Sequence, residues 1–234
     1  NMEKAKLLSF ISKYSLGGSV ESVIWGLQDN SITTTFVSSD KTLKGTVSMN
    51  DAEIDTSMAE VGIYTTSQLV RMLSILDDDI KVTITDTNVQ VNDKYTDFNF
   101  ILADLDVIPK SPVLKVTPSF TSTIKITADF INKFVKSYSA LPDNEFFTIH
   151  GDALSKQLVF GYSSINSNRI SFDIEVDTQD IQPIHFSSNL MREILVANKG
   201  TFGTLEISPV GLARVKFNTA ETTAEYYLVS KQID

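Results

Sequence analysis

Four segments of this chain have the apolar spacing of a short amphipathic helix. Apolar residues at positions i, i+3, i+4 and i+7 share one face of a helix with 3.6 residues per turn. The spacing is met by Leu7, Phe10, Ile11 and Tyr14; by Leu69, Met72, Leu73 and Leu76; by Phe130, Ile131, Phe134 and Tyr138; and by Met191, Ile194 and Leu195. Helices this short are stable when their apolar face packs on another element, so we expect all four to lie against sheets.

Residues typical of helix ends flank these segments. Thr65 or Thr66, Thr127, and Ser187 or Ser188 stand where an N-cap hydroxyl is expected. At the other ends lie Gly17 and Gly18, Pro142, and Gly200, which favour helix termination.

The stretches between the helices favour β-strands, because many of them alternate apolar and polar residues with a period of two. Ile170-Ser171-Phe172-Asp173-Ile174 is one example. Three strands are expected after each helix: 22–28, 32–38 and 44–49; 80–85, 89–92 and 97–102; 146–151, 157–162 and 169–176; 204–208, 213–218 and 225–229. The predicted order is one helix and then three strands, four times, which is an α+β architecture of antiparallel sheets.

The pattern divides the chain into two similar halves. The second helix of each half has the same approach, Tyr64-Thr65-Thr66 in one and Phe186-Ser187-Ser188 in the other. Between the halves, three prolines without turn glycines indicate an extended connector. We therefore predict an N-terminal domain at 1–108, a connector at 109–118 and a C-terminal domain at 119–234.

Positive charge is concentrated in the four helical segments. Their formal charges add to +5, which leaves −14 for the remainder of a chain whose net charge is −9. Lys and Arg are good helix formers and occupy solvated faces without any function, so a structural explanation remains open. The functional interpretation is a basic surface facing phosphates on an otherwise acidic protein.

A search for catalytic chemistry finds nothing that predicts an enzyme. The chain has no cysteine, which excludes disulfides and thiolate metal sites. We expect His150 and His185 to be packed or rim residues, and Asp77-Asp78-Asp79 to be a solvated loop. Gly161-Tyr162-Ser163-Ser164-Ile165 lacks the closing glycine of a nucleophile elbow. No cofactor, metal or membrane partner is expected, and no apolar run approaches the length of a membrane helix.

The repeated pattern resembles the DNA sliding clamps, and length and two-domain plan are most similar to the processivity clamps of T-even-type bacteriophages. Two stretches also look like proliferating cell nuclear antigen. One is Asp97–Val107, similar to an edge strand that runs into a Leu-x-Asp-Leu-Asp-Val-like stretch, and the other is Glu225–Lys231, similar to a closing Tyr-Tyr-Leu strand. Gly211 departs from the pattern, because a proline stands there in that clamp's partner pocket.

The resemblance implies a DNA-clamp fold and a homotrimeric ring around duplex DNA. Its helices would line the hole and contact phosphates without reading sequence. The implied DNA-facing residues are Lys4, Lys6, Lys13, Arg71, Lys133, Lys136, Arg192 and Lys199. By analogy, strand Tyr95–Ala103 of one subunit would pair with Arg169–Val176 of the next. The implied interface residues are Phe98, Phe100, Ile170, Phe172 and Ile174.

The resemblance also implies partners: a DNA polymerase and a clamp loader that insert short hydrophobic peptides beside the connector. The implied pocket residues are Val37, Leu105, Val107, Ile108, Leu212, Tyr227 and Val229, each of which ordinary packing also explains. A clamp of this kind would work in the cytoplasm of an infected bacterial host.

Two other functions stay open at this point. One is a duplicated β-rich structural or virion module whose basic residues are incidental. The other is a monomeric processivity factor held on DNA by charge, which the net charge of −9 disfavours.

Overall fold

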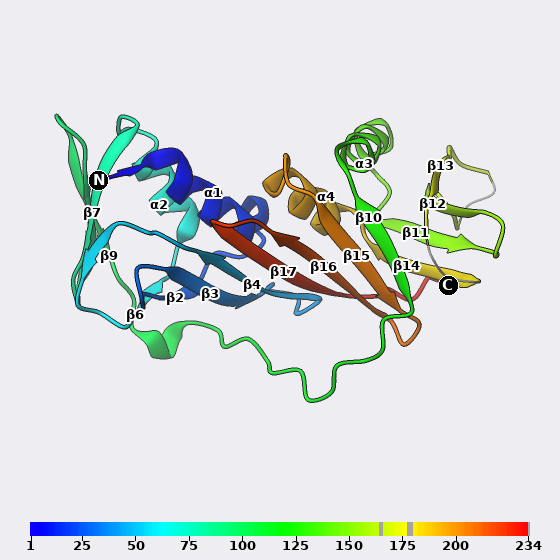
Figure 1. Cartoon of the computed structure of the whole chain (residues 1–234), viewed down its shortest axis with the longest axis horizontal. Coiled ribbons are helices and arrows are strands. Elements are labelled where there is room, and N and C mark those ends of the chain that lie inside the picture. The colour runs from blue at the N-terminus through cyan, green and yellow to red at the C-terminus, as the bar shows by residue number, and fades with distance from the viewer. Residues whose placement is uncertain (164–165, 177–179, 234) are drawn as a thin grey trace. The chain divides into compact units, whose positions relative to one another are not determined.

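The computed structural model describes residues 1–163, 166–176 and 180–233, and these form two compact units. Unit 1 comprises Asn1–Pro112 with Thr219–Ala224, and unit 2 comprises Val113–Asn218 with Glu225–Asp234. The division after Pro112 falls within the residues for which a connector is expected. Each unit is described by itself below (Figure 1).

Unit 1 contains two helices and nine strands among its described residues. The helices are α1 (Lys4–Ser15) and α2 (Thr66–Leu73), and short 3-10 turns lie at Leu16–Gly18 and Leu105–Val107. The strands are β1 (Met2–Glu3), β2 (Val23–Gly26), β3 (Ile32–Val37), β4 (Leu43–Met49), β5 (Ile54–Thr56), β6 (Glu60–Ile63), β7 (Asp79–Ile84), β8 (Asn88–Asn92) and β9 (Asp97–Ile101). They run in the orders β4-β3-β2-β6 and β1-β7-β8-β9, and β5 pairs in parallel with β7.

Unit 2 repeats this plan with helices α3 (Ala128–Ala140) and α4 (Ser188–Ala197). Its strands are β10 (Ser122–Ile126), β11 (Phe146–Gly151), β12 (Lys156–Phe160), β13 (Ile170–Ile174), β14 (Ile181–Ser187), β15 (Gly203–Ser208), β16 (Leu212–Asn218) and β17 (Thr222–Val229). They run in the orders β13-β12-β11-β14 and β10-β15-β16-β17. The first three residues of β17 belong to unit 1.

The predicted order of one helix and three strands is incomplete, because a strand also precedes every helix. That strand pairs with the first strand after the other helix of its unit: β1 with β7, β6 with β2, β10 with β15, and β14 with β11. Each of these strands runs directly into its helix with little or no turn between them, so no turn signal separates the two elements in the sequence. Each half of a unit thus contributes one strand to the sheet of the other half, and this pairing joins the two halves.

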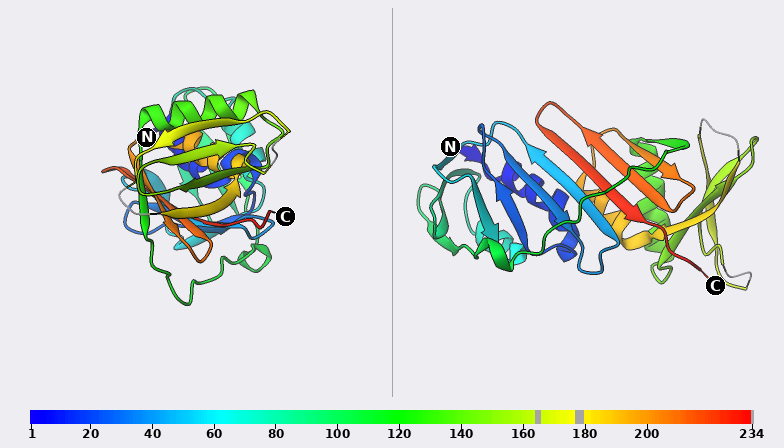
Figure 2. Two further views of the ribbon diagram at one scale, coloured as in Figure 1. Left: turned by 90° about the vertical axis from the view of Figure 1, so that its right-hand side faces the viewer. Right: turned by 90° about the horizontal axis from the view of Figure 1, so that it is seen from below.

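The predicted helix stripes form the core. Their buried members are Leu7, Phe10, Ile11, Tyr14, Leu69, Leu73, Leu76, Phe130, Ile131, Phe134, Met191, Ile194 and Leu195. Met72 and Tyr138 are only half-buried. Burying one such side chain stabilises the fold by roughly 1.5–3 kcal/mol. Within unit 1, α1 packs on β4, and within unit 2, α4 packs on β11 and β14, so in each unit a helix covers one face of a sheet (Figure 2).

Two of the predicted N-caps are confirmed and one is wrong. Thr127 Oγ1 accepts from Phe130 N at 3.1 Å, and Ser187 Oγ accepts from Leu190 N at 3.3 Å. Thr65 makes no side-chain cap at α2. Instead Glu21, distant in sequence, accepts from the backbone N–H of Ser67 at 3.3 Å and from its hydroxyl at 2.8 Å.

Candidate DNA-facing, self-association and partner surfaces

The three lysines of α1 bond to protein oxygens. Lys4 Nζ donates to the carbonyl of Leu76 at 2.5 Å, and Lys6 Nζ donates to the carbonyl of Asp51 at 2.9 Å. Lys13 Nζ donates to Ser9 Oγ at 2.9 Å, and burial lowers its pKa from the usual value. These cations are therefore held against unit 1.

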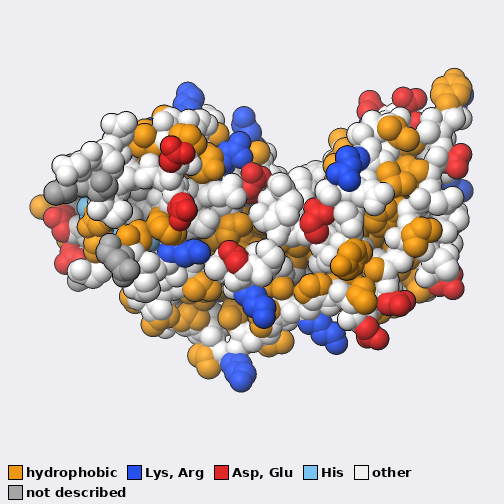
Figure 3. Space-filling model, turned by 180° about the vertical axis from the view of Figure 1, so that it is seen from behind, with side chains coloured by type: hydrophobic (Ala, Val, Ile, Leu, Met, Phe, Trp, Pro, Cys, Tyr) orange, Lys and Arg blue, Asp and Glu red, His pale blue; other side chains and the backbone are white. Residues whose placement is uncertain are grey.

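The basic residues of the other helices differ in exposure. Arg71, Lys133, Lys136 and Lys199 are exposed, and Figure 3 shows Lys and Arg side chains standing at the margin of the molecule where α3 lies. Lys133 forms an i,i+4 ion pair with Asp129 at 3.2 Å. Both partners are largely solvated, so the pair is weak and can yield to another anion.

Arg192 differs from these exposed cations because its side chain contacts two other side chains. It pairs with Glu193 at 2.9 Å, and its guanidinium lies 5.4 Å from the ring centroid of Tyr138. It is half-buried and fixed by these contacts.

Strand β9 is the last strand of its sheet and bonds only to β8 among the described strands. Phe98 and Phe100 point into unit 1, with 8% and 6% of their surface exposed. Leu102 N donates to the carbonyl of Thr87 on the β8 side. Because backbone groups alternate in direction along an antiparallel strand, Asn99 and Ile101 direct their N–H groups to the open side.

Strand β13 is likewise last in its sheet and bonds only to β12 among the described strands. Ile170 and Phe172 are half-buried, and Ile174 is buried. Phe172 meets Phe130 of α3 edge-on at 6.2 Å. Strands β9 and β13 are therefore both edge strands among the described residues.

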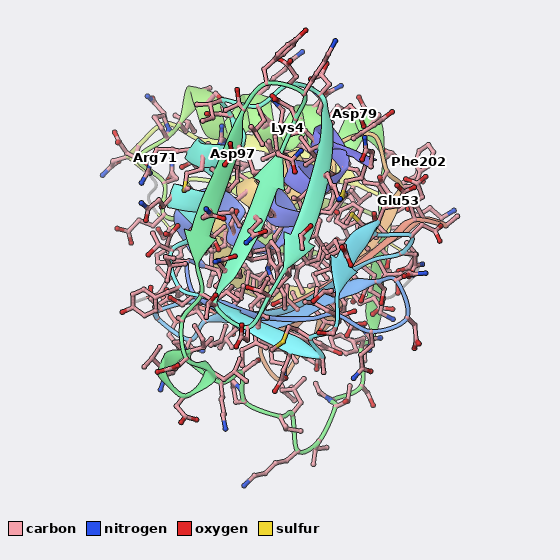
Figure 4. The ribbon with its side chains drawn as sticks, turned by 90° about the vertical axis from the view of Figure 1, so that its left-hand side faces the viewer. Lys4, Glu53, Arg71, Asp79, Asp97 and Phe202 are labelled. Atoms are coloured by element: carbon pink, nitrogen blue, oxygen red, sulfur yellow. The ribbon has the colours of Figure 1, made fainter. Side chains whose placement is uncertain are left out.

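A cavity of about 690 Å³ lies beside β9 in unit 1. Its wall includes Tyr64, Gln68 and Met72 near α2, and Ile101 and Val107 near the end of β9. Tyr64 is 55% exposed and Ile101 is 71% exposed. Figure 4 shows Arg71 on the β9 side of this sheet, away from Asp79 at the start of β7.

The predicted pocket residues of unit 1 differ in their exposure. Val37 and Leu105 are half-buried, and Val107 is 56% exposed. Ile108 is a buried residue that fixes the start of the connector. Two residues absent from the prediction fix its next part: Ser111 Oγ donates to the carbonyl of Phe36 at 3.3 Å, and Lys44 Nζ donates to the carbonyl of Pro112.

The predicted pocket residues of unit 2, Leu212, Tyr227 and Val229, share the outward face of their sheet, since the residues alternating with them are buried. A cavity of about 360 Å³ lies nearby, lined by 121–122, 180–185, 207, 209–211 and 230–233. Gly211 has φ 104°, and a Cβ there would stand 2.6 Å from Ser230 Oγ. The turn therefore requires the glycine that departs from the clamp pattern.

Three further residues, Phe120, Glu206 and Arg214, were absent from the prediction. The guanidinium of Arg214 lies 4.2 Å from the ring centroid of Phe120, and Arg214 Nε donates to Glu206. These contacts join residues that are distant in the sequence, so no local sequence signal identifies them.

The histidines have packing roles. His185 Nδ1 and Thr148 Oγ1 lie 2.7 Å apart in a hydrogen bond. The Tyr162 ring stands 5.0 Å from the His150 ring and 5.8 Å from the His185 ring. Burial lowers the pKa of both histidines, and nearby Arg169 lowers that of His150 further. Ser164 and Ile165 of the elbow-like motif lie outside the described residues.

The predicted acidic loop extends only to Asp78, because Asp79 is the first residue of β7. Asp93 accepts from the N–H groups of Asp77, Tyr95 and Thr96, which lowers the pKa of its carboxyl. No group of three or more potential metal ligands occurs in the described part of the chain. Nor is any helix there long and apolar enough to span a bilayer.

This arrangement, with a strand, a helix and three strands repeated four times and open strands at β9 and β13, is the DNA-clamp fold. Proliferating cell nuclear antigen (PCNA) structures match it over nearly the whole chain. A. fulgidus PCNA, described with the C-terminal region of FEN-1 bound, matches with TM-score 0.78, 14% identity and coverage of 100% of this chain and 98% of the other. Entamoeba histolytica PCNA gives TM-score 0.74, 14% identity, and coverage of 98% and 96%.

A chain of the PCNA2–PCNA3 complex from Sulfolobus tokodaii gives TM-score 0.77, 10% identity, and coverage of 98% of each chain. No protein-family model matches the sequence, and no curated protein matches it. At such low identities the likeness establishes a shared fold, and the residues that carry function must be argued from this chain.

Proposed function

We propose that this chain is a DNA sliding clamp, a non-enzymatic protein whose copies form a closed homotrimeric ring around duplex DNA. The ring would tether a replicative polymerase and make its synthesis processive. The observation that carries the proposal is the pair of open strands, β9 in unit 1 and β13 in unit 2. Two different edges on one chain suit head-to-tail association, which closes into a ring at a fixed rotation.

Closure would also protect these strands. An open strand with an apolar row invites uncontrolled pairing with other chains. Pairing β9 of one copy with β13 of the next would use both edges in every copy. The clamp fold suggests three copies, because rings of this family contain about six such units.

The exposed cations of the helices support the DNA-binding part of the proposal. Arg71, Lys133, Lys136 and Lys199 are exposed at or near the ends and outer faces of α2, α3 and α4. Contacts from such side chains to phosphates position a duplex without reading its sequence. The other predicted cations would contribute to the positive electrostatic potential of the DNA-facing surface while keeping their protein contacts. They are Lys4, Lys6, Lys13 and Arg192.

The outward face suits partner peptides. The structure of A. fulgidus PCNA is described with a C-terminal region of FEN-1 bound to it. We propose that this chain binds short hydrophobic peptides of its polymerase and clamp loader at Val37, Leu105 and Val107 of unit 1 and at Leu212, Tyr227 and Val229 of unit 2. Ile108 would act by fixing the connector, since it is buried.

We also propose that this chain is a clamp of the kind found in T-even-type bacteriophages. On this proposal the protein would act in the cytoplasm of an infected bacterium. A polymerase and a loader encoded with the chain are therefore the partners to test.

Light scattering across micromolar concentrations tests the ring. We expect the mass of three chains, whereas a stable monomer would refute the closed ring and favour a charge-held factor or a structural module. The second measurement loads the protein onto nicked circular DNA with its loader. Linearising the circle should release a ring, and polymerase run length should increase in its presence. If the protein stays bound after the circle is linearised, it does not encircle the DNA.

A further inference from the structure

Phe120 lies two residues beyond the connector and two residues before β10. The guanidinium of Arg214 stands over its ring, 4.2 Å from the centroid. At this distance the positive charge interacts with the negative face of the ring. The contact fixes the connector to the outward face of unit 2.

Arg214 is itself held in one orientation. It stands directly opposite Glu206 in the β15–β16 pair, and its Nε donates to the Glu206 carboxylate. This hydrogen bond is the main reason that the pKa of Arg214 is raised. The side chains of Arg214 and Glu206 are only 19% and 18% exposed. A guanidinium so enclosed gives Phe120 a fixed platform.

The same guanidinium also contacts the proposed partner surface. Tyr227 lies on the neighbouring strand and faces outward with Arg214. Burial raises the pKa of the Tyr227 hydroxyl, and the nearby Arg214 guanidinium partly offsets that rise. Arg214 therefore contacts the residue that follows the connector and lies beside a predicted pocket residue.

The connector has a different attachment in unit 1. There Ser111 and Lys44 bond to backbone carbonyls, and Ile108 is buried. Between the two attachments, Val113 is 86% exposed and Val116 is 80% exposed. The middle of the connector is thus an exposed apolar segment between fixed ends.

We propose that Arg214 is a positioning residue that holds Phe120 and Tyr227 together and thereby sets the course of the connector beside the partner surface. Its importance for partner binding rests on the proposed function, whereas its hold on the connector does not. Arg214 would act on a bound peptide through Tyr227 and the connector rather than by reading the peptide itself.

Hydrogen exchange on the full chain tests the hold directly. In Arg214→Gln, the amides of 119–121 should exchange about three- to thirtyfold faster, the range expected for one cation–π contact. Phe120→Leu should match it, Phe120→Tyr should preserve wild-type exchange, and the double variant should add nothing to either single change. Lys216→Gln removes a neighbouring cation that lies 3.9 Å from the same carboxylate, and it should leave these amides unchanged.

Unchanged exchange in Arg214→Gln, or an equal acceleration in Lys216→Gln, would overturn the proposal. Circular dichroism melting of each variant separates the local effect from loss of the fold.

A peptide of the FEN-1 C-terminal region, the segment bound to the A. fulgidus protein, serves as the binding probe. Arg214→Gln should weaken it by about tenfold and Lys216→Gln should not. If the wild-type chain binds no probe while the exchange result holds, the proposed pocket is contradicted and the positioning role stands. If the probe binds equally to both variants, Arg214 has no effect on partner binding.

Discussion

Strand β9 of unit 1 and strand β13 of unit 2 are both open strands, but their apolar rows are covered to different degrees. Phe98 and Phe100 of β9 are buried within their own unit, whereas Ile170 and Phe172 of β13 are half-exposed. Strand β9 thus offers mainly backbone groups and the nearby cavity, while β13 offers uncovered apolar surface. Complementary edges of this kind favour head-to-tail pairing over pairing of like edges.

The largest expected effect comes from changing the open side of β9. Asn99→Pro removes an N–H that points away from β8, so the β8–β9 bonds remain. Losing this donor to a neighbouring copy costs about 3 kcal/mol, or roughly 100-fold in self-association. Light scattering at micromolar concentrations should therefore show monomer, with a melting temperature close to wild type.

Asn99→Ala is the matched control, because it keeps the N–H and should stay trimeric. A trimeric Asn99→Pro would show that β9 is not the strand that pairs between copies.

The start of the second helix gives the next comparison between the units. In unit 1, Thr66 Oγ1 donates to the carbonyl of Glu21 at 2.8 Å and bonds the buried Tyr14 hydroxyl at 2.8 Å. Thr66→Val should cost about 1–3 kcal/mol of unfolding free energy, since a buried hydroxyl loses a partner. Ser187→Ala in unit 2 removes only a local cap, worth about 1 kcal/mol.

Urea unfolding of both variants measures the difference. Equal losses would mean that the distant network around Tyr14 contributes no more than an ordinary cap does.

These two helix starts show what the sequence can and cannot predict. Thr127 and Ser187 cap their helices through residues three positions away, and the apolar stripes are equally local, so both could be predicted from spacing. Glu21 caps α2 from another part of unit 1, and Arg214 meets Phe120 across strands. Such contacts exist only after the strands pair, so no window of sequence contains them. The strands before the helices were missed because no turn residue marks their ends.

The candidate site also has some features that local sequence predicts and others that depend on the tertiary fold. Which lysines lie on helices follows from periodicity, and the exposure of Lys133 and Lys136 agrees with their place opposite the apolar stripe. That Lys4 and Lys6 bond to the carbonyls of Leu76 and Asp51 depends on tertiary packing. Helices α1 and α3 therefore present their lysines differently, although the sequence makes them look alike.

Charge reversal on α3 sharpens this contrast. Lys133→Glu with Lys136→Glu should reduce retention on nicked circular DNA by about tenfold and make its salt dependence shallower, because fewer phosphate contacts form. The trimer should persist. Lys125→Glu, on the outward face of β10 in the same unit, is the control and should leave retention unchanged.

Loss of the trimer in the double reversal would place α3 at a subunit contact instead. Retention equal to wild type would show that the exposed helix cations do not face DNA.

The smallest expected effect is a pH dependence confined to unit 2, which holds both histidines of the chain. Burial lowers the pKa of His150 and His185 below the usual 6.5, so the folded state binds fewer protons than the unfolded state. Stability from these groups is present above pH 6.5 and is lost as pH falls through their folded pKa values.

Hydrogen exchange at pH 7.5 and 5.5, corrected for intrinsic rates, should show β11 and β14 opening more often at the lower pH. We expect a change below about tenfold, because both rings are only partly enclosed. Asp93 and Asp152 have pKa values below 3.8 and titrate outside this window. A His150→Gln and His185→Gln variant should lose the effect, and β2 and β3 of unit 1 should never show it. If both units open equally at pH 5.5, their unfolding is coupled. The two units would then not be independent in stability.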